Sequence, residues 1–518
     1  MEFFTEQFFV ALEQTFATGP ILMLLAGVFV GIVFGIIPGL QTVTALGVFL
    51  PLTFWWDPLY SMYFFAGIIG SCGGGGSVPA ILLNMPGTAA NAAAALDGYP
   101  LAKKGEAVFA LNVSAMTSTI GALFSVCVLF ILIPILSPVL LHIGPQEIFW
   151  VATFGLITML FAITKDYLKG LVSLGVGIAL TQIGLGGPGL PAPRFTFGSN
   201  YLIEGVDVIV VVLGFLVVSE VLQNLITDNS ISTEKKTKLE SVGNIPTKKI
   251  KNKEQMINGW LAPFKNFWLT LRSSVIGLFV GIIPGVGGSV AQFISYNAAV
   301  AYSSDKSKFG QGAVEGLVAS EAAVNAKDGG QLFPTLLFGI PGSAEMAIVL
   351  AAWQVHGLNP GPFFLRDHGV LAWALIIGLL LANLLSAIFV ILISSFISKV
   401  RTLNISVVSC VVFSFTIVAV FIIRQNILDV ISVVLFGFIA MFMRRYGYSA
   451  IGVVIGFVLG SVVEDNWNLT LQAGRGDLYG FVSTPGSLVI AVLSAITVAA
   501  IIYTFIRKNF LGVKKNGK

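Results

Sequence analysis

Four Pro-Gly pairs inside apolar stretches are the residues best placed to do chemistry in this sequence. They stand at Pro38-Gly39, Pro86-Gly87, Pro284-Gly285 and Pro341-Gly342. Proline lacks a backbone donor and clashes with the preceding turn, and glycine permits the turn that follows, so each pair breaks a helix. In lipid, such a break persists only where protein or a water-filled cavity receives the freed backbone groups. The four pairs therefore predict interrupted helices around an internal site.

Small polar residues near the breaks supply the ligands that such a site needs. The start of a half-helix attracts anions, and freed carbonyl and hydroxyl oxygens suit a hard cation such as Na⁺. We therefore expect a substrate anion to bind with Na⁺ or H⁺ as coupling ion, and no other cofactor. The candidate substrate- and ion-binding residues are Pro38, Gly39, Thr42, Ser77, Asn84, Pro86, Gly87, Thr88, Asn91, Pro284, Gly285, Ser289, Asn325, Pro341, Gly342, Ser343 and Glu345.

The fourth break is expected to expose backbone N–H groups to a substrate carboxylate. Gly342 is predicted to leave open space beside its backbone, because it has no Cβ. Glu345 follows within an apolar run, and an intramembrane charge indicates function. Two other acidic residues near the breaks, Asp97 and Asp328, are expected at the membrane interface. A simple proline kink fits a single break better than four breaks in a duplicated pattern.

The composition requires lipid as the solvent. Of 518 residues, 56% are hydrophobic and only 10% are charged, whereas soluble domains carry about 25% charged residues. Helices and closed barrels alone satisfy the backbone in lipid, and long continuous apolar stretches such as 107–133 favour helices. The sequence predicts an all-α integral membrane protein with about 10–12 transmembrane helices. The net charge of +4 comes from loops and the tail, and no nucleic-acid binding is expected.

Basic residues predict the topology. Lysines crowd a hydrophilic linker at 227–268 and a tail at 507–518, and short basic segments lie in the cytoplasm. Two apolar halves remain, 1–226 and 269–506, the second with an extra terminal helix. The acidic N-terminus is then expected outside, in a multi-pass protein of the cell (inner or plasma) membrane. No Lys or Arg precedes Lys103, so no signal peptide is expected and the first apolar segment should be retained.

The two halves contain an internal repeat. The segment 31–40 recurs as 277–286, and the segment 79–89 recurs in the same order as 334–344. The flanking charges place the two copies on opposite sides, which predicts inverted-topology repeats of the kind that build secondary transporters. At Pro38 and Pro284 we favour a re-entrant hairpin over a kinked span. No P-loop and no His, Cys and carboxylate cluster for a metal ion is evident, so ATP is not the expected driver.

These residues resemble the large membrane subunit of the tripartite tricarboxylate transporters, the TctA family. The matching segments are Gly35-Ile-Ile-Pro-Gly39, Gly75-Gly-Ser77, Ala80-Ile-Leu-Leu-Asn-Met-Pro-Gly87, Leu96-Asp-Gly-Tyr-Pro-Leu-Ala-Lys-Lys-Gly105, Gly281-Ile-Ile-Pro-Gly285, Gly312-Ala-Val-Glu-Gly316, Glu321-Ala322 with Asn325-Ala326, Gly339-Ile-Pro-Gly-Ser-Ala344 and His356-Gly-Leu-Asn-Pro-Gly-Pro362. The resemblance covers residues from about 20 to 505. It implies two partners, a small membrane subunit and an extracytoplasmic solute-binding protein, and uptake driven by an ion gradient. Val78-Pro79, Thr88 and Ser320 depart from the family pattern near the expected site, which leaves the carboxylate unassigned.

The sequence therefore predicts a transporter subunit and not an enzyme. It would move small organic anions, di- or tricarboxylates or other carboxylates, inward by symport with a cation. The alternative is an intramembrane enzyme acting on a lipid-borne substrate, which would need a clustered acid/base or metal pair at mid-membrane depth. A channel is a third hypothesis, although broken helices in inverted repeats favour alternating access.

Overall fold

The computed structural model describes most of the chain. The described residues are 2–37, 40–140, 143–163, 166–187, 192–226, 252–284, 287–358, 360–361, 363–394 and 405–509. Pro38, Gly39 and Gly285 lie outside the described residues, as do most of the linker and of the tail. These parts of the sequence predictions stay predictions.

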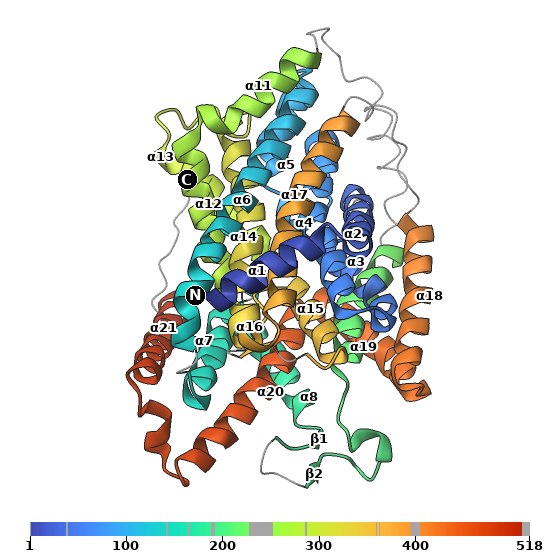
Figure 1. Ribbon diagram of the computed structural model, residues 1–518, viewed down its shortest axis with the longest axis vertical. Coiled ribbons are helices and arrows are strands. Elements are labelled where there is room, and N and C mark those ends of the chain that lie inside the picture. The colour runs from blue at the N-terminus through green and yellow to red at the C-terminus, as the bar shows by residue number, and fades with distance from the viewer. Residues whose placement is uncertain are drawn as a thin grey trace. The chain divides into compact units, whose positions relative to one another are not determined.

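The chain forms two compact units, one of Met1–Leu140 with Ile209–Met441 and one of Leu141–Val208 with Phe442–Lys518. The helices of the first unit are α1 (Glu2–Thr15), α2 (Thr18–Ile36), α3 (Thr42–Phe49), η1 (Leu50–Trp55), α4 (Pro58–Leu83), η2 (Ala89–Asn91), α5 (Ala94–Lys103), α6 (Ala107–Leu140), α9 (Val208–Val212), η4 (Leu213–Val218), α11 (Asn252–Lys265), α12 (Phe267–Ile282), α13 (Gly287–Tyr302), α14 (Val314–Phe338), α15 (Ala344–Val355), α16 (Phe364–Asp367), α17 (Gly369–Ser394), α18 (Ile405–Arg424) and α19 (Ile427–Arg445). Figure 1 labels them along the ribbon. The four Pro-Gly pairs fall in the connections α2–α3, α4–η2, α12–α13 and α14–α15, so the prediction that the long helices end at these pairs is confirmed at the three that the structure describes in part or whole.

The second unit draws helices from both halves of the sequence. Its elements are α7 (Pro145–Ile163), α8 (Tyr167–Thr181), β1 (Gly184–Leu185), β2 (Pro193–Arg194), η3 (Asn200–Leu202), α20 (Ala450–Ala473), η6 (Leu478–Val482) and α21 (Pro485–Asn509). β1 and β2 pair antiparallel, and α20 packs on α7 and α8. A cavity of about 330 Å³ in this unit contains the ion pair of Arg194 and Glu464, whose Nη1 and Oε1 atoms are 2.6 Å apart. None of the break residues lines this cavity.

The fold class predicted from composition is confirmed. Eight helices among the described residues are long and apolar enough to cross a membrane, judged by length and composition. They are Thr18–Ile36, Pro58–Leu83, Ala107–Leu136, Val208–Ile226, Gly369–Leu392, Ile427–Arg445, Ala450–Ala473 and Pro485–Tyr503. Helix α14 has 25 residues but carries several charged side chains, and α12 has 16 residues. The number of crossings beyond these eight stays a prediction.

Glycine lets α2 pack directly on the backbone of α4, and the two helices lie side by side in Figure 1. Gly27, Gly31 and Gly35 recur every fourth residue on α2 and so share one face. A Cβ built on Gly31 would lie 2.7 Å from the carbonyl oxygen of Ile68. A Cβ on Gly35 would lie 2.8 Å from the backbone nitrogen of Gly76. Small residues at this spacing are how helices approach closely in lipid.

The second half repeats the same contact between α12 and α14. A Cβ on Gly277 would lie 2.8 Å from Cα of Ala323, and one on Gly281 would lie 3.0 Å from Cα of Gly330. The sequence repeat aligns Gly31 with Gly277 and Ile68 with Ala323, so equivalent residues make equivalent contacts. The contacts between the halves are also reciprocal. Helix α6 of the first half packs on α14 of the second, and α17 of the second half packs on α4 of the first. The halves thus share their local packing, and their inversion across the membrane stays a prediction.

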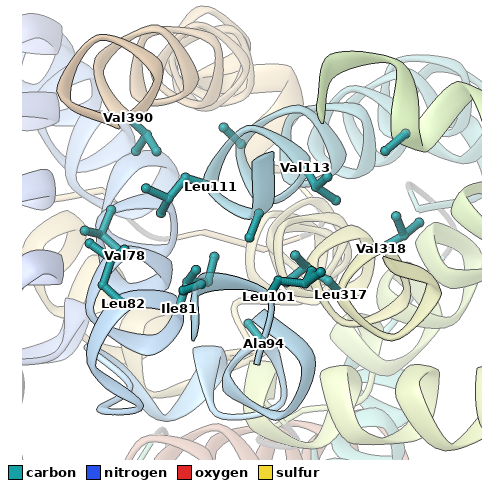
Figure 2. Close-up of a cluster of buried hydrophobic side chains, with 14 of the residues drawn as sticks. Val78, Ile81, Leu82, Ala94, Leu101, Leu111, Val113, Leu317, Val318 and Val390 are labelled. Carbon is teal, nitrogen blue, oxygen red and sulfur yellow. The ribbon is translucent and has the colours of Figure 1, made fainter. Parts of the chain in front are cut away.

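A buried apolar cluster holds α4, α5, α6, α14 and α17 together. Figure 2 shows Val78, Leu101, Leu111, Leu317 and Val390, one from each helix, among its members. Lipid tails are as apolar as these side chains, so close van der Waals contact rather than exclusion of water stabilises the cluster. The cluster fixes α5, which follows the second break, against α14, which precedes the fourth.

The glycine contacts generate a stability prediction. Gly31→Leu should lower the free energy of unfolding of the purified protein by about 1–3 kcal/mol, the usual cost of overpacking. The leucine side chain would collide with the α4 backbone. Thermal unfolding in detergent, followed by size-exclusion chromatography, measures this. Gly175→Leu on α8 is the control, since no atom lies within 4 Å of a Cβ at that position. Equal loss at both positions would contradict the proposed role of the α2–α4 contact.

Candidate functional site

The second and fourth breaks begin with the same backbone feature. Asn84 ends α4 in the left-handed conformation with φ 53°, and Gly339 ends α14 with φ 66°. The sequence repeat aligns these two residues. Asparagine and glycine are the residues that adopt this conformation most readily, so each helix ends at a residue suited to reverse the chain. Asn84 is exposed, and the structure shows it as a helix cap.

The glycines of these two breaks pack against the long helix that precedes them. A Cβ on Gly87 would lie 2.6 Å from Cα of Gly76, and one on Gly342 would lie 2.7 Å from Cα of Gln331. Gly76 and Gln331 are again aligned by the repeat. The expectation that Gly342 leaves open space for a substrate is therefore wrong. The space beside it is filled by α14, and its N–H donates to the Thr335 hydroxyl at 3.3 Å.

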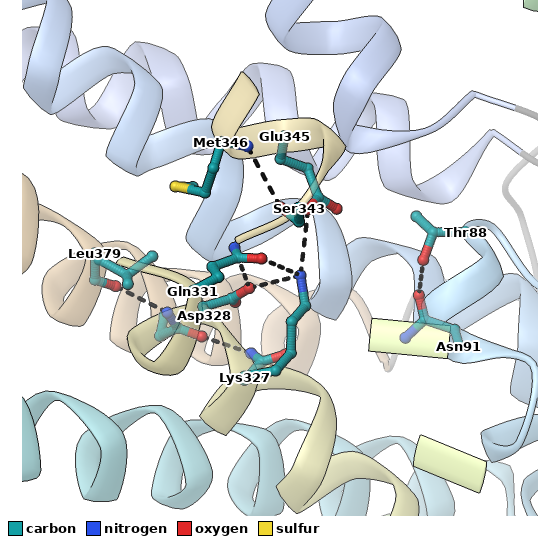
Figure 3. Close-up of polar contacts among 11 residues, drawn as sticks. Thr88, Asn91, Lys327, Asp328, Gln331, Ser343, Glu345, Met346 and Leu379 are labelled. Atoms are coloured by element: carbon teal, nitrogen blue, oxygen red, sulfur yellow. Dashed lines mark hydrogen bonds and ion pairs between the residues drawn. The ribbon is translucent and has the colours of Figure 1, made fainter. Parts of the chain in front are cut away.

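A chain of hydrogen bonds runs from the second break into α14. The Thr88 hydroxyl donates to Oδ1 of Asn91 at 2.6 Å (Figure 3). Nδ2 of Asn91 donates to the Ser77 hydroxyl at 2.7 Å and to the Gly73 carbonyl at 3.0 Å. Ser77 donates in turn to both carboxylate oxygens of Glu321, at 2.9 and 3.1 Å. Three predicted site residues, Thr88, Asn91 and Ser77, are thus joined to one buried acid.

Lys327 is a site residue that the sequence reasoning missed. Its ammonium lies 2.8 Å from Oδ1 of Asp328 and 3.6 Å from Oε2 of Glu345 (Figure 3). Gln331 completes the group, with Oε1 3.4 Å from the lysine and Nε2 donating to Asp328 at 3.2 Å. The side chains of Lys327 and Asp328 are each 6% exposed, and that of Glu345 is 19% exposed. Lys327, Asp328, Gln331 and Glu345 together form the Lys327 cluster.

The Lys327 cluster contains two acidic side chains and only one basic side chain. A buried ammonium is tolerated only when it is paired and hydrogen-bonded, and here one cation faces two carboxylates. The repeat aligns Lys327-Asp328 with Cys72-Gly73, so the charges belong to the second half alone. The adjacent lysine and aspartate in the segment before the fourth break were the signal that could have revealed this site, because charges within a membrane segment are costly.

Three of the breaks meet around the side chain of Lys327. Glu345, which pairs with it, lies in the first turn of α15 after the fourth break. A Cβ built on Gly288, in the first turn of α13 after the third break, would lie 2.8 Å from Cε of Lys327. The same Cβ would lie 2.9 Å from Cβ of Ala90, which follows the second break. The first break is linked less directly: the Thr42 side chain is a partner of the Cys72 thiol on α4.

The other predicted residues divide into those held by local structure and those not described. Ser343 caps α15 by accepting from the Met346 N–H at 3.3 Å, and Asn325 donates to Asn383 at 2.5 Å. Ser289 is half-buried in the first turn of α13. Of the prolines, Pro284 and Pro341 are buried and Pro86 is half-buried. Pro38, Gly39 and Gly285 lie outside the described residues. A binding role for each of these residues stays a prediction.

Asp97 and Asp328 are both buried within the protein, and their expected depth at the membrane interface stays a prediction. Asp97 accepts from the N–H groups of Gly312 and Ala313 at 2.9 and 2.8 Å, and from the Tyr296 hydroxyl at 2.9 Å. These two N–H groups precede the start of α14, where a negative charge is stabilising. Asp97 thus fastens α5 to the beginning of α14, and Asp328 pairs with Lys327.

The long apolar helices and their interrupted partners define a multi-pass α-helical membrane protein. The family model described as "Tripartite tricarboxylate transporter TctA family" matches residues 21–455. The chain belongs to this family, so the resemblance seen in the sequence is confirmed. It is therefore a subunit of the tricarboxylate transporter class.

Two curated proteins from Agrobacterium vitis are similar to this chain. One, described as "Uncharacterized 52.8 kDa protein in TAR-I ttuC' 3'region", is 30% identical over 482 residues, which cover 91% of each chain. The other, "Uncharacterized protein in TAR-II ttuC' 3'region", is 29% identical over 209 residues, covering 40% of this chain and 86% of its own. No solved structure matches this chain.

The Lys327 cluster generates a second stability prediction. Lys327→Met should destabilise the protein by about 3–5 kcal/mol, because it leaves Asp328 buried without its cation. Adding Asp328→Asn should recover much of that loss, since the orphaned charge is then removed. Lys308→Met is the control: Lys308 forms a half-exposed pair with Glu315, and such pairs contribute about 0–1 kcal/mol. Thermal unfolding that fails to rank the variants in this order would contradict the buried pair.

The left-handed cap at Asn84 can be separated from a ligand role. Asn84→Gly should preserve both stability and transport, because glycine adopts φ 53° freely. Asn84→Val should lower stability by about 1–2 kcal/mol, the cost of a left-handed residue with a Cβ. Unfolding temperature and uptake are measured together. Loss of transport in a stable Asn84→Gly variant would instead assign a binding role to the amide.

Proposed function

We propose that this chain is the translocating subunit of a secondary active transporter that moves small organic anions inward with a co-transported cation. The observation that carries the proposal is the Lys327 cluster, a buried ammonium at the meeting point of three helix breaks. The description of the family as transporters of tricarboxylates supports di- or tricarboxylates, or other carboxylates, as the substrate class. The chain would transport these anions without changing them chemically, and so would not be an enzyme.

The two acidic partners of Lys327 differ in a way that suggests how a substrate binds. Asp328 is close and almost fully buried, whereas Glu345 is 3.6 Å away and more exposed. A substrate carboxylate would replace Glu345 on the ammonium, because a direct charge-assisted hydrogen bond is shorter and stronger than this long pair. The first turns of α13 and α15 would add the partial positive charge of a helix start.

Charge balance explains why a cation should travel with the substrate. The Lys327 cluster already holds two carboxylates for one ammonium when all three are ionised, and each further anion adds negative charge in a site of low polarity. An unmatched buried charge is costly, so Na⁺ or H⁺ must enter with the anion. Movement of the two inverted repeats, residues 1–226 and 269–506, against each other would then open the site to one side of the membrane at a time.

The proposed setting is the cell (inner or plasma) membrane, with the central linker and the C-terminus in the cytoplasm and the N-terminus outside. The basic linker and tail support this orientation. The word "tripartite" in the family description supports two protein partners. We infer these to be a small membrane subunit and an extracytoplasmic solute-binding protein that delivers the anion.

Reconstituted uptake tests the proposal. Proteoliposomes containing both membrane subunits, supplied with the binding protein, should accumulate at least one of radiolabelled citrate, succinate and malate when a Na⁺ or proton gradient is imposed. ATP should have no effect, since no Walker motif is evident in the sequence. Accumulation that persists after both gradients are collapsed and requires ATP would overturn the proposal.

The same proteoliposomes test the site by comparing two lysines. Lys327 lies within α14, and Lys308, the control, precedes this helix. Lys327→Gln with Asp328→Asn removes the ammonium without leaving Asp328 charged, and should abolish uptake while the protein still inserts. Lys308→Gln changes a lysine outside the Lys327 cluster and should transport normally. Uptake by the double variant at the wild-type rate would exclude Lys327 as the anion ligand.

A further inference from the structure

Glu321 is a buried acid that pairs with no basic side chain among the residues that the structure describes. It is the eighth of the 25 residues of α14 and is 1% exposed. Its carboxylate accepts from Ser77 of α4 at 2.9 and 3.1 Å, and Ser114 of α6 is a second hydroxyl partner. None of the ion pairs among the described residues includes Glu321.

The charged groups on the elements packed against α14 are committed elsewhere or exposed. Asp97 of α5 accepts hydrogen bonds from the N–H groups that precede α14 and from the Tyr296 hydroxyl of α13. Glu345 of α15 pairs with Lys327. Arg272 of α12 lies over the ring of Tyr302, and Arg366 of α16 pairs with Asp367. On α11, Lys253, Glu254 and Lys265 are exposed. On α14 itself, Glu315 pairs with Lys308 and Asp328 with Lys327.

An ionised carboxylate in this position would be a buried charge without a counter-ion. Such a charge costs several kcal/mol even after hydrogen bonding, whereas a protonated carboxyl is neutral and needs no counter-ion. The site therefore has to hold either a proton or a metal cation. Which of the two it holds depends on the oxygen atoms that surround the carboxylate.

The oxygens beside Glu321 are already accepting hydrogen bonds. The Ser77 hydroxyl and the Gly73 carbonyl both accept from Asn91, and Oδ1 of Asn91 accepts from Thr88. A hard metal cation needs a shell of several oxygen ligands, which here would have to come from oxygens that already accept these hydrogen bonds. A proton needs one carboxylate oxygen, and the structure offers two. This arrangement favours a proton over Na⁺.

We propose that Glu321 binds the coupling proton of transport. The proposal rests on the transporter function proposed above and adds the ion and the residue that carries it. An O–H bond forms on Glu321 from a proton supplied on the outside, and the same bond breaks when the proton leaves to the cytoplasm. The hydrogen-bond chain from Thr88 through Asn91 and Ser77 connects this carboxyl to the second break, so movement there changes the donors that Glu321 receives.

Glu321→Gln in the complete system tests the proposal, because glutamine resembles the protonated acid in shape and neutrality. The probe is whichever of radiolabelled citrate, succinate and malate the wild type accumulates best. The variant should lose accumulation driven by a proton gradient and lose substrate-dependent proton uptake. It should retain exchange of internal for external label in the absence of any gradient. Glu315→Gln, on the same helix in a half-exposed pair, should keep both activities.

Ser77→Ala provides an independent readout if the glutamine variant does not insert. Removing this hydroxyl takes a donor from the charged carboxylate, so the proton binds more tightly and the pH of half-maximal uptake should rise. An unchanged pH profile in Ser77→Ala, or proton-driven accumulation in Glu321→Gln, would overturn the assignment of Glu321 while leaving the transporter function standing. Wild-type protein that accumulates none of the three carboxylates under any gradient would overturn both.

Discussion

A lysine ammonium buried among helices can persist only if carboxylates are brought to it, and this requirement organises the centre of the first unit. Asp328 comes from the same helix as Lys327, but Glu345 comes from α15, beyond the fourth break. The chain must therefore reverse at Gly339 and return along α14 for the pair to form. The ion pair of Lys327 and Glu345 thus holds the segment after the fourth break against α14.

Close backbone contact gives these breaks their fixed positions. Glycines bring α2 onto α4 and α12 onto α14, and further glycines at positions 87 and 342 bring each returning segment onto the long helix. The same aligned residues make the contact in both halves, so the duplicated sequence has kept a duplicated scaffold. The charges have not been duplicated: Lys327 aligns with Cys72 and Glu321 with Ala66.

The sequence predicted what depends on local chemistry and missed what depends on helix register. Proline and left-handed residues act on their own backbone, so the ends of α4 and α14 could be located from Pro86 and Pro341. The partners of Lys327 and Glu321 depend on how far α14 is shifted along α4 and α15, which no local pattern encodes. The contacts of Asp97 depend on packing in the same way, since the sequence does not show that α5 lies against the start of α14.

The uneven charge distribution gives α14 a particular place in the proposed mechanism. Lys327 and Glu321 are six residues apart, which separates them by about 9 Å along the helix and turns them to different faces. Lys327 faces the segments that follow the breaks, and Glu321 faces Ser77 and Ser114 on α4 and α6. A shift of this one helix would change the surroundings of both groups together. Anion binding and proton binding could then be coupled by rigid movement, without a ligand shared between the two sites.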